Sequence, residues 1–265
     1  MNRCVACGRE FSGQGELCPE CQAQGHIRPA PATAMETARM HEVTVFIIGV
    51  NVLVFILMVA LGASFTNPSR DYVMFFGGSQ GYRVMRGHEY WRLLTANYVH
   101  WGAIHLTLNM YCLWGLGQLL ELFYSRRDYF LLYSYTGMAG ALLSVALHPE
   151  FVVSAGASGA VFGVAGVLLT TLKFGHLPLP APARSALFKS ILQFAGINLV
   201  LGFAVLRVDN AGHLGGLLSG LLAGALLGKH LDGSEASAAH RTRAWVGLWV
   251  GLAILVWLVK SWRVG

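Results

Sequence analysis

The chain has 265 residues, of which 55% are hydrophobic and only 12% charged, and its mean hydropathy is +0.53. Because the apolar residues come in long blocks, this composition excludes a single soluble domain and predicts an all-α membrane protein. The formal net charge of +6 calls for no nucleic-acid partner, since much of it is explained by basic residues in the loops on one side of the membrane.

The chain begins with two CxxC pairs separated by ten residues: Cys4, Cys7, Cys18 and Cys21. Two such pairs can supply four thiolates to a tetrahedral zinc ion, and Gly8 after the first pair suits the tight turn of a zinc ribbon. Residues 1–25 are therefore predicted to form a zinc-ribbon-like module, and residues 26–41 a flexible linker. Disulfides and an iron–sulfur cluster are the alternatives. A cytoplasmic location argues against disulfides, and so short a segment needs some such staple in order to fold.

Seven segments are long and apolar enough to span a bilayer, which takes about 20 residues, or slightly fewer where a helix starts below the surface. These segments are residues 43–63, 105–124, 129–147, 158–174, 187–206, 212–228 and 244–259. A polar stretch with four cysteines precedes the first of them. That span is therefore not expected to be a cleavable signal peptide.

Lys and Arg in the short loops predict the orientation of the chain. If the N-terminus is cytoplasmic, the inside loops are basic and the short outside loops hold only Arg207. The long first loop, residues 64–104, carries four arginines and is the exception. We therefore expect a cytoplasmic N-terminus and an outside C-terminus. The compact build and the absence of an organelle-targeting segment favour the bacterial inner membrane.

Polar residues that suit nucleophilic catalysis gather at one depth in this arrangement. His105 and Asn109 lie in the first turns of the second span, Ser158 begins the fourth, and His213 is near the start of the sixth. A serine and a histidine at one depth can form a nucleophile–base pair. Asn109 and His105 offer side-chain donors that suit an oxyanion hole, although both residue types also join helices in membranes.

Glycine spacing predicts where two spans approach closely. Glycine recurs at every fourth position through the sixth span, at 212, 216, 220, 224 and 228. This spacing strips one helix face bare, so that a neighbouring backbone can pack against it. Carboxylates are not found in the spans near His213, since Asp209 falls in the preceding loop. A Ser–His dyad is therefore expected rather than a triad.

Over residues 43–230 the chain resembles the rhomboid family of intramembrane serine proteases. Four separated motifs carry the likeness, in the family's order: Trp91-Arg92 in the first loop, His105-x-x-x-Asn109, Gly156-Ala157-Ser158-Gly159, and His213-x-x-Gly216-x-x-x-Gly220. His100 falls where the family often has a further histidine, and Phe162 stands where many relatives have tyrosine. An aromatic face packed under His213 would survive that exchange.

The resemblance implies a serine endopeptidase that cleaves transmembrane segments of other proteins near the outer leaflet. Ser158 would be the nucleophile and His213 the general base. The side chains of His105 and Asn109, with the backbone N–H of Ser158, would stabilise the oxyanion. Catalysis would need no cofactor, and zinc would be structural. The partners would be transmembrane substrates and the lipid bilayer. The zinc module, which lies outside the resemblance, is expected to bind a cytoplasmic protein.

The resemblance also implies a six-helix core over residues 42–230, followed by a cytoplasmic loop and a seventh helix over residues 231–265. The first loop would lie half-embedded in the outer leaflet. There, Trp91 and Arg92 are expected to act as an interface anchor, with the arginine reaching toward water.

Two other classes of protein are compatible with seven spans. A transporter or channel would favour charged groups near the midplane and symmetry between the halves, whereas the polar residues here cluster near one face. A non-catalytic membrane-protein binder could use the same scaffold, with the zinc module as its recruiting arm. Labelling by a fluorophosphonate would separate the protease from both, because only an activated serine reacts.

Overall fold

The structure is a computed structural model that describes residues 2–4, 9–12, 18–23, 41–148, 150–175, 177, 179–204, 208–231 and 234–264. The chain divides into two compact units, Met1–Met40 and His41–Gly265. In the first unit, the short strands β1 (Asn2–Arg3) and β2 (Glu10–Phe11) pair antiparallel, and a one-turn helix, α1 (Pro19–Ala23), follows.

Three buried cysteines meet in this first unit. The sulfur atoms of Cys4, Cys18 and Cys21 lie within 4.8 Å of one another, and the Cys18 backbone N–H donates to the Cys4 sulfur at 3.2 Å. Phe11 packs against the cluster. The fourth predicted ligand, Cys7, and most of the predicted linker lie outside the described residues. Three of the four thiol positions are thus close enough to share one metal ion.

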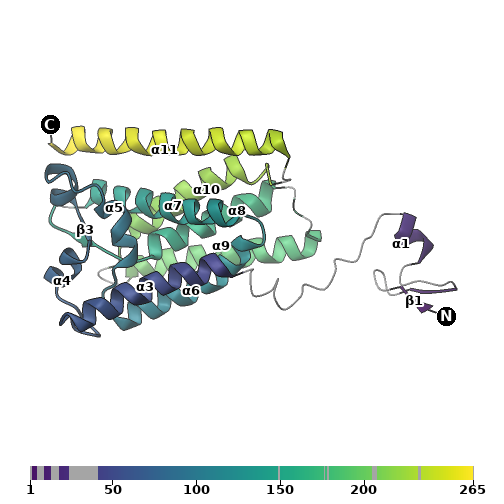
Figure 1. Ribbon diagram of the computed structural model, residues 1–265, viewed down its shortest axis with the longest axis horizontal. Helices are drawn as coiled ribbons and strands as arrows, with labels where there is room; N and C mark the ends of the chain where they lie inside the picture. Colours follow the sequence, from purple (N-terminus) through teal and green to yellow (C-terminus); the bar gives the residue numbers. More distant parts are fainter. Residues whose placement is uncertain are drawn as a thin grey trace. The chain divides into compact units, whose positions relative to one another are not determined.

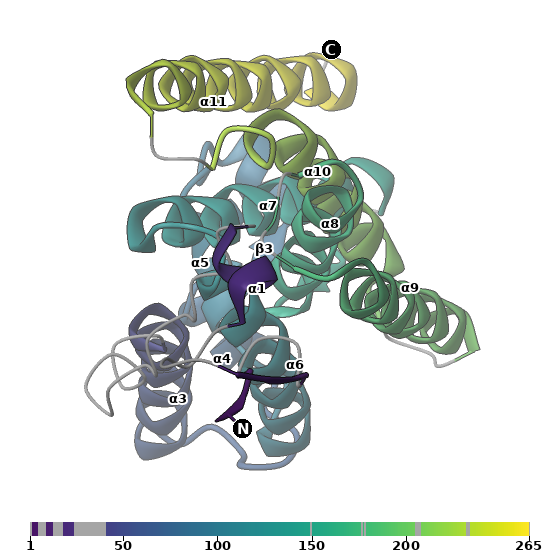
Figure 2. The ribbon, with the colours of Figure 1, turned by 90° about the vertical axis from the view of Figure 1, so that its right-hand side faces the viewer.

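The second unit is a bundle of long helices (Figures 1 and 2). They are α3 (Glu42–Ala60), α6 (Ala103–Glu121), α7 (Arg126–Leu147), α8 (Ser158–Phe174), α9 (Ala181–Ala204), α10 (Asn210–Leu227) and α11 (Glu235–Val264). By length and composition, five helices in the described residues can cross a membrane, namely α3, α7, α9, α10 and α11. Helix α8 is a shorter apolar helix of 17 residues, as its sequence predicts.

Each of the seven predicted spans falls on one of these helices, but several helices are longer than the predicted spans. Helix α9 begins at Ala181 rather than at residue 187, and α11 begins at Glu235 rather than at residue 244. The first turns of α11 carry His240, Arg241 and Arg243. Such residues lower hydropathy without preventing a helix, so a hydropathy window finds the apolar part of a helix and misses its polar ends.

The connection between α3 and α6 folds into short elements. These are α4 (Arg70–Phe75), β3 (Ser79–Gln80), the π-helical turn η1 (Tyr82–Arg86), α5 (Arg92–Thr95) and the 3₁₀ turn η2 (Ala96–Tyr98). Strand β3 pairs antiparallel with β4 (Val153–Ser154), which lies between α7 and α8, and Ser79 is opposite Ser154. The first loop is thereby tied to the segment that leads into Ser158.

The structure contradicts the prediction that the Arg92 guanidinium extends toward water. Its side chain is buried, at 6% exposure, and Nη1 donates to the carbonyls of Met74 and Gly78 at 2.7 and 3.0 Å. Its Nε bonds the Glu89 carboxylate at 2.5 Å, and the guanidinium lowers the pKa of that carboxyl. Trp91 is half exposed. Arg92 therefore holds the loop together from inside, because a guanidinium can bond several carbonyls at once.

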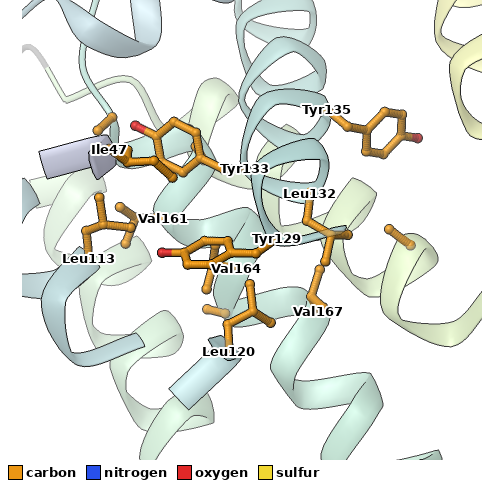
Figure 3. Packing of buried hydrophobic residues seen from close by; sticks show 14 of the residues in the cluster. Ile47, Leu113, Leu120, Tyr129, Leu132, Tyr133, Tyr135, Val161, Val164 and Val167 are labelled. Carbon is orange, nitrogen blue, oxygen red and sulfur yellow. The ribbon is translucent and has the colours of Figure 1, made fainter. Parts of the chain in front are cut away.

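Helix α7 lies in the middle of the apolar core (Figure 3). Its fully buried Tyr129, Leu132 and Tyr133 pack among side chains from α3, α6 and α8. The buried hydroxyl of Tyr129 bonds Thr44 of α3 at 3.2 Å. Buried polar atoms of this kind require a partner inside a membrane protein, and α7 finds one on a neighbouring helix.

The glycine spacing predicts close packing, and the structure confirms it. A Cβ added at Gly216 of α10 would collide with the carbonyl oxygen of Gly159, and one at Gly220 would collide with that of Gly163. A Cβ at Gly166 of α8 would come within 2.8 Å of the Leu221 backbone nitrogen. Helices α8 and α10 therefore touch backbone to backbone, which leaves little freedom in their relative position.

Candidate active site

A cavity of about 890 Å³ opens among α6, α8, α9 and α10 and the segment before α8. The four residues that the sequence singles out all line it: His105, Asn109, Ser158 and His213. Each lies within the first two turns of its helix. Residues from three separate helices thus meet around one space large enough for a peptide segment.

The turn before Ser158 depends on a glycine. Gly156 has φ of +137°, a backbone conformation that residues with a side chain rarely adopt. A Cβ at this position would come within 2.6 Å of the His105 ring. The Gly156 N–H donates to the Ala96 carbonyl at 2.9 Å. Ser158 then begins α8, whose first backbone N–H groups have no carbonyl one turn earlier to bond. This is the environment in which backbone donors can stabilise an oxyanion.

His100 supports the same turn from the first loop. Its Nε2 accepts a hydrogen bond from the Ala157 N–H at 3.3 Å. Burial, with a smaller effect from the neighbouring His105, lowers the pKa of His100 to about 3. The imidazole is therefore neutral at physiological pH, which leaves a ring nitrogen free to accept. The sequence marks this histidine through family resemblance, whereas its hydrogen-bond partner is visible only in the structure.

His213 is oriented by stacking. Its side chain is 8% exposed and lies face to face with Phe162, with ring centroids 4.4 Å apart and an interplanar angle of 15°. This confirms the predicted aromatic face under the histidine. Among the described residues, its buried Nδ1 has no hydrogen-bond partner. In the part of the chain that the structure describes, no side chain therefore orients the imidazole through this nitrogen.

His105 and Asn109 offer donors on the other side of the cavity. His105 Nδ1 accepts from the Trp101 N–H at 3.3 Å, so the neutral ring carries its proton on Nε2. Asn109 is buried, and its Nδ2 donates to the His105 carbonyl at 2.9 Å. An amide nitrogen has two hydrogens, and one is left for a ligand. Within the described residues, each of the two side chains therefore keeps a donor without a partner, which is what an oxyanion site needs.

Three residues at this cavity to which the sequence assigns no role come from the connections between helices. His148, Ser154 and Asp209 line it, and Asp209 caps α10 by accepting from the Gly212 N–H at 2.8 Å. Aspartate is a preferred residue at the position just before a helix, because its carboxylate accepts from an N–H two or three residues into the helix. That signal could have been found in the sequence, whereas the contacts to His148 and Ser154 depend on tertiary structure.

Residues 87–230, more than half of the chain, match the family model described as the rhomboid domain. The chain belongs to the rhomboid family. It is similar to rhomboid protease GluP of Bacillus subtilis, with 36% identity over 175 residues, which cover 66% of this chain and 32% of that one. It is also 36% identical to RHOMBOID-like protein 6, mitochondrial, of Arabidopsis thaliana over 154 residues, 58% of this chain and 49% of the other.

A third relative matches over more of its own length. The putative rhomboid protease YdcA of Bacillus subtilis is 28% identical over 180 residues, 68% of this chain and 85% of that protein. The chain thus spans a third to a half of the first two relatives and most of the third. With its apolar helices, the chain is an all-α, multi-pass integral membrane protein.

Proposed function

We propose that this rhomboid-family chain is an intramembrane serine endopeptidase that cleaves transmembrane segments of other membrane proteins. The observation that carries the proposal is the convergence of a serine, a stacked histidine and two side-chain donors on one cavity among apolar helices. Relatives that are named proteases support it. The bilayer and the transmembrane substrate are then its partners.

In the proposed mechanism, His213 takes the proton of the Ser158 hydroxyl as the oxygen attacks the scissile carbonyl. The Ser158 N–H, the Asn109 amide and the His105 Nε2–H stabilise the negative charge that develops on the carbonyl oxygen. His213 then gives its proton to the leaving amine, and an acyl-enzyme forms. Water, deprotonated by His213, hydrolyses that ester and returns Ser158 to its starting state.

The charge pattern of the loops supports a cytoplasmic N-terminus, and the proposed location is the bacterial inner membrane. In that orientation α6, α8 and α10 begin at the outer face, so cleavage occurs near the outer leaflet. Helix α8 is also short, since its 17 residues span only about 25 Å at 1.5 Å per residue. Its first residue therefore lies below the outer membrane surface. Ser158 then lies in a recess shielded from lipid.

The N-terminal cysteines carry a second proposal within the same chain. Residues 1–25 bind one structural zinc through Cys4, Cys7, Cys18 and Cys21, and residues 26–41 link them to the protease core. The support is the 4.8 Å grouping of three of these sulfurs together with the spacing of the fourth cysteine. Catalysis needs no metal, and the module recruits a cytoplasmic protein.

The test is cleavage of a doubly tagged transmembrane substrate by the purified full-length protein in proteoliposomes. The wild type is expected to give two fragments, and Ser158→Ala none. Ser219→Ala is the matched control, because Ser219 lies on α10 and its hydroxyl bonds the Gly216 carbonyl of its own helix at 2.9 Å. Equal cleavage by the wild type and Ser158→Ala would refute the proposed function.

A further inference from the structure

Asp209 holds the first turn of α10, the turn that carries His213, in two ways. Its Oδ1 accepts from the Gly212 N–H at 2.8 Å, and its backbone carbonyl accepts from the His213 N–H at 3.1 Å. A carboxylate at a helix N-terminus also interacts favourably with the helix dipole. One residue just outside the helix thus bonds two backbone N–H groups of the turn that carries His213.

The same carboxylate reaches the segment that leads to Ser158. Its Oδ2 accepts a hydrogen bond from the hydroxyl of Ser154 in β4, four residues before the serine of the cavity. Strand β4 is held in turn by its pairing with Ser79 of β3. Hydrogen bonds to a charged acceptor are stronger than neutral ones. Asp209 thus joins the strand before the candidate nucleophile to the turn that carries the candidate base.

Two neighbours fit around this carboxylate. His148, just after α7, has its Nδ1 3.7 Å from Asp209 Oδ1 and 3.1 Å from the Ser144 hydroxyl. On the other side, a Cβ added at Gly212 would come within 2.8 Å of Asp209 Oδ2. Glycine at 212 therefore leaves the space that the carboxylate occupies. Segments from α7, β4 and α10 all meet at Asp209.

We propose that Asp209 is a positioning residue that fixes the placement of His213 relative to Ser158 without touching the reacting atoms. The proposal rests on the function proposed above. Stacking on Phe162 sets the tilt of the imidazole, and the glycine contacts position α10 against α8. The bridge from Ser154 through Asp209 to Gly212 adds a link between the first turn of α10 and the segment before Ser158. A misplacement of about 1 Å can cost on the order of a hundredfold in rate.

Asp209→Asn is the decisive variant. Asparagine still caps a helix, but it loses the charge and one of the two acceptor oxygens. We expect kcat to fall roughly ten- to a hundredfold, with KM and the thermal unfolding temperature little changed. Glu150→Gln is the matched control: it removes a carboxylate from the connection between α7 and α8, the one that contains Ser154. There Glu150 bonds Arg86 at 3.1 Å, and kcat should be unaffected.

A double-mutant cycle with Ser154→Ala tests the bridge itself, and the milder Ser154→Ala serves alone if Asp209→Asn does not fold. We expect Ser154→Ala to lower kcat less than Asp209→Asn, and the double variant to be no worse than Asp209→Asn, because both remove one connection. Unchanged kcat in Asp209→Asn, or a loss that only follows the folded fraction, would overturn the positioning role. So would unchanged kcat in Ser154→Ala, or additive effects of the two changes. A wild type that cleaves nothing would instead overturn the proposed function.

Discussion

The two walls of the cavity are built differently. The packed wall consists of α8 and α10, whose glycines bring backbone against backbone, and it carries Ser158 and His213. The exposed wall consists of α6 and α9. In α9, which the structure describes in full, three of 24 residues are buried, and it lies at the edge of the bundle (Figure 2). Ser158 and His213, which the proposed function requires at a fixed mutual position, thus lie where helix packing is tightest.

The difference also bears on how a peptide could enter. Exposed apolar side chains such as Leu108 of α6 and Phe203 of α9 suit contact with lipid. Regions with few buried contacts open locally at the lowest free-energy cost. Under the proposed function, a rigid packed wall beside a less buried one combines a fixed nucleophile–base pair with a side of the cavity that can yield to a helix-sized substrate.

The largest loss of activity is expected from removing Ser158 or His213 on the packed wall. Ser158→Ala and His213→Ala should each reduce cleavage to background, and the double variant should be no worse than either, because a nucleophile and its base act as a unit. Thermal unfolding should change little. His240→Ala, outside the cavity in α11, is the control and should cleave normally. Clearly measurable cleavage by His213→Ala would contradict its role as base.

A smaller loss is expected from the exposed wall. Asn109→Ala removes one oxyanion donor and should lower kcat by roughly 10²–10³, which leaves activity measurable. Asn198→Ala is the matched control, because Asn198 lines the same cavity from α9 and its Nδ2 bonds the Phe194 carbonyl of its own helix at 2.8 Å. Full kcat in Asn109→Ala at saturating substrate would show that this residue does not stabilise the oxyanion.

Replacing a helical glycine by alanine should lower the free energy of unfolding on the packed wall but not on the exposed wall. Gly220→Ala on the packed wall places a methyl group against the Gly163 carbonyl and should destabilise the protein by about 1–3 kcal/mol. Gly196→Ala on α9 meets nothing within 4 Å and should be neutral or stabilise by about 0.5–1 kcal/mol. Unfolding in a mild detergent measures both. Equal stability of the two variants would mean that the glycine contacts do not position α10.

The smallest expected effect on cleavage comes from metal removal. The full-length protein should contain about one zinc per chain, and a chelator should unfold residues 1–25, since binding and folding of so short a module are one event. Cleavage of a generic transmembrane substrate should remain largely intact. Cys18→Ser should lose the metal and keep activity, with Cys112→Ser as the control that retains both. Full zinc content in Cys18→Ser would refute the site.

The elements that could be predicted from the sequence are those whose pattern lies within a single segment. The apolar blocks predict the spans, and the glycine repeat predicts the contact between α8 and α10. The spacing of His105 and Asn109 places both on one helix face. These features are periodic within a single segment, so no knowledge of the other segments is needed to read them.

What the sequence missed depends on contacts between distant segments. Arg92 is charged and was expected near water, yet it bonds carbonyls 14 and 18 residues away. Asp209 looks like a loop residue until Ser154 is seen to donate to it. In both cases a residue's own polarity gives no information about the partner that tertiary structure brings to it. The polar first turns of α11 were missed for a local reason, because they form helix beyond the apolar window.

The central claim is that Ser158 is an activated nucleophile on the packed wall, and labelling of the full-length protein by a fluorophosphonate tests it most directly. Peptide mapping by mass spectrometry locates the adduct. The account predicts one adduct on Ser158 in the wild type and in Ser219→Ala, little in His213→Ala and none in Ser158→Ala. An unlabelled wild type, or equal labelling in Ser158→Ala, would contradict it.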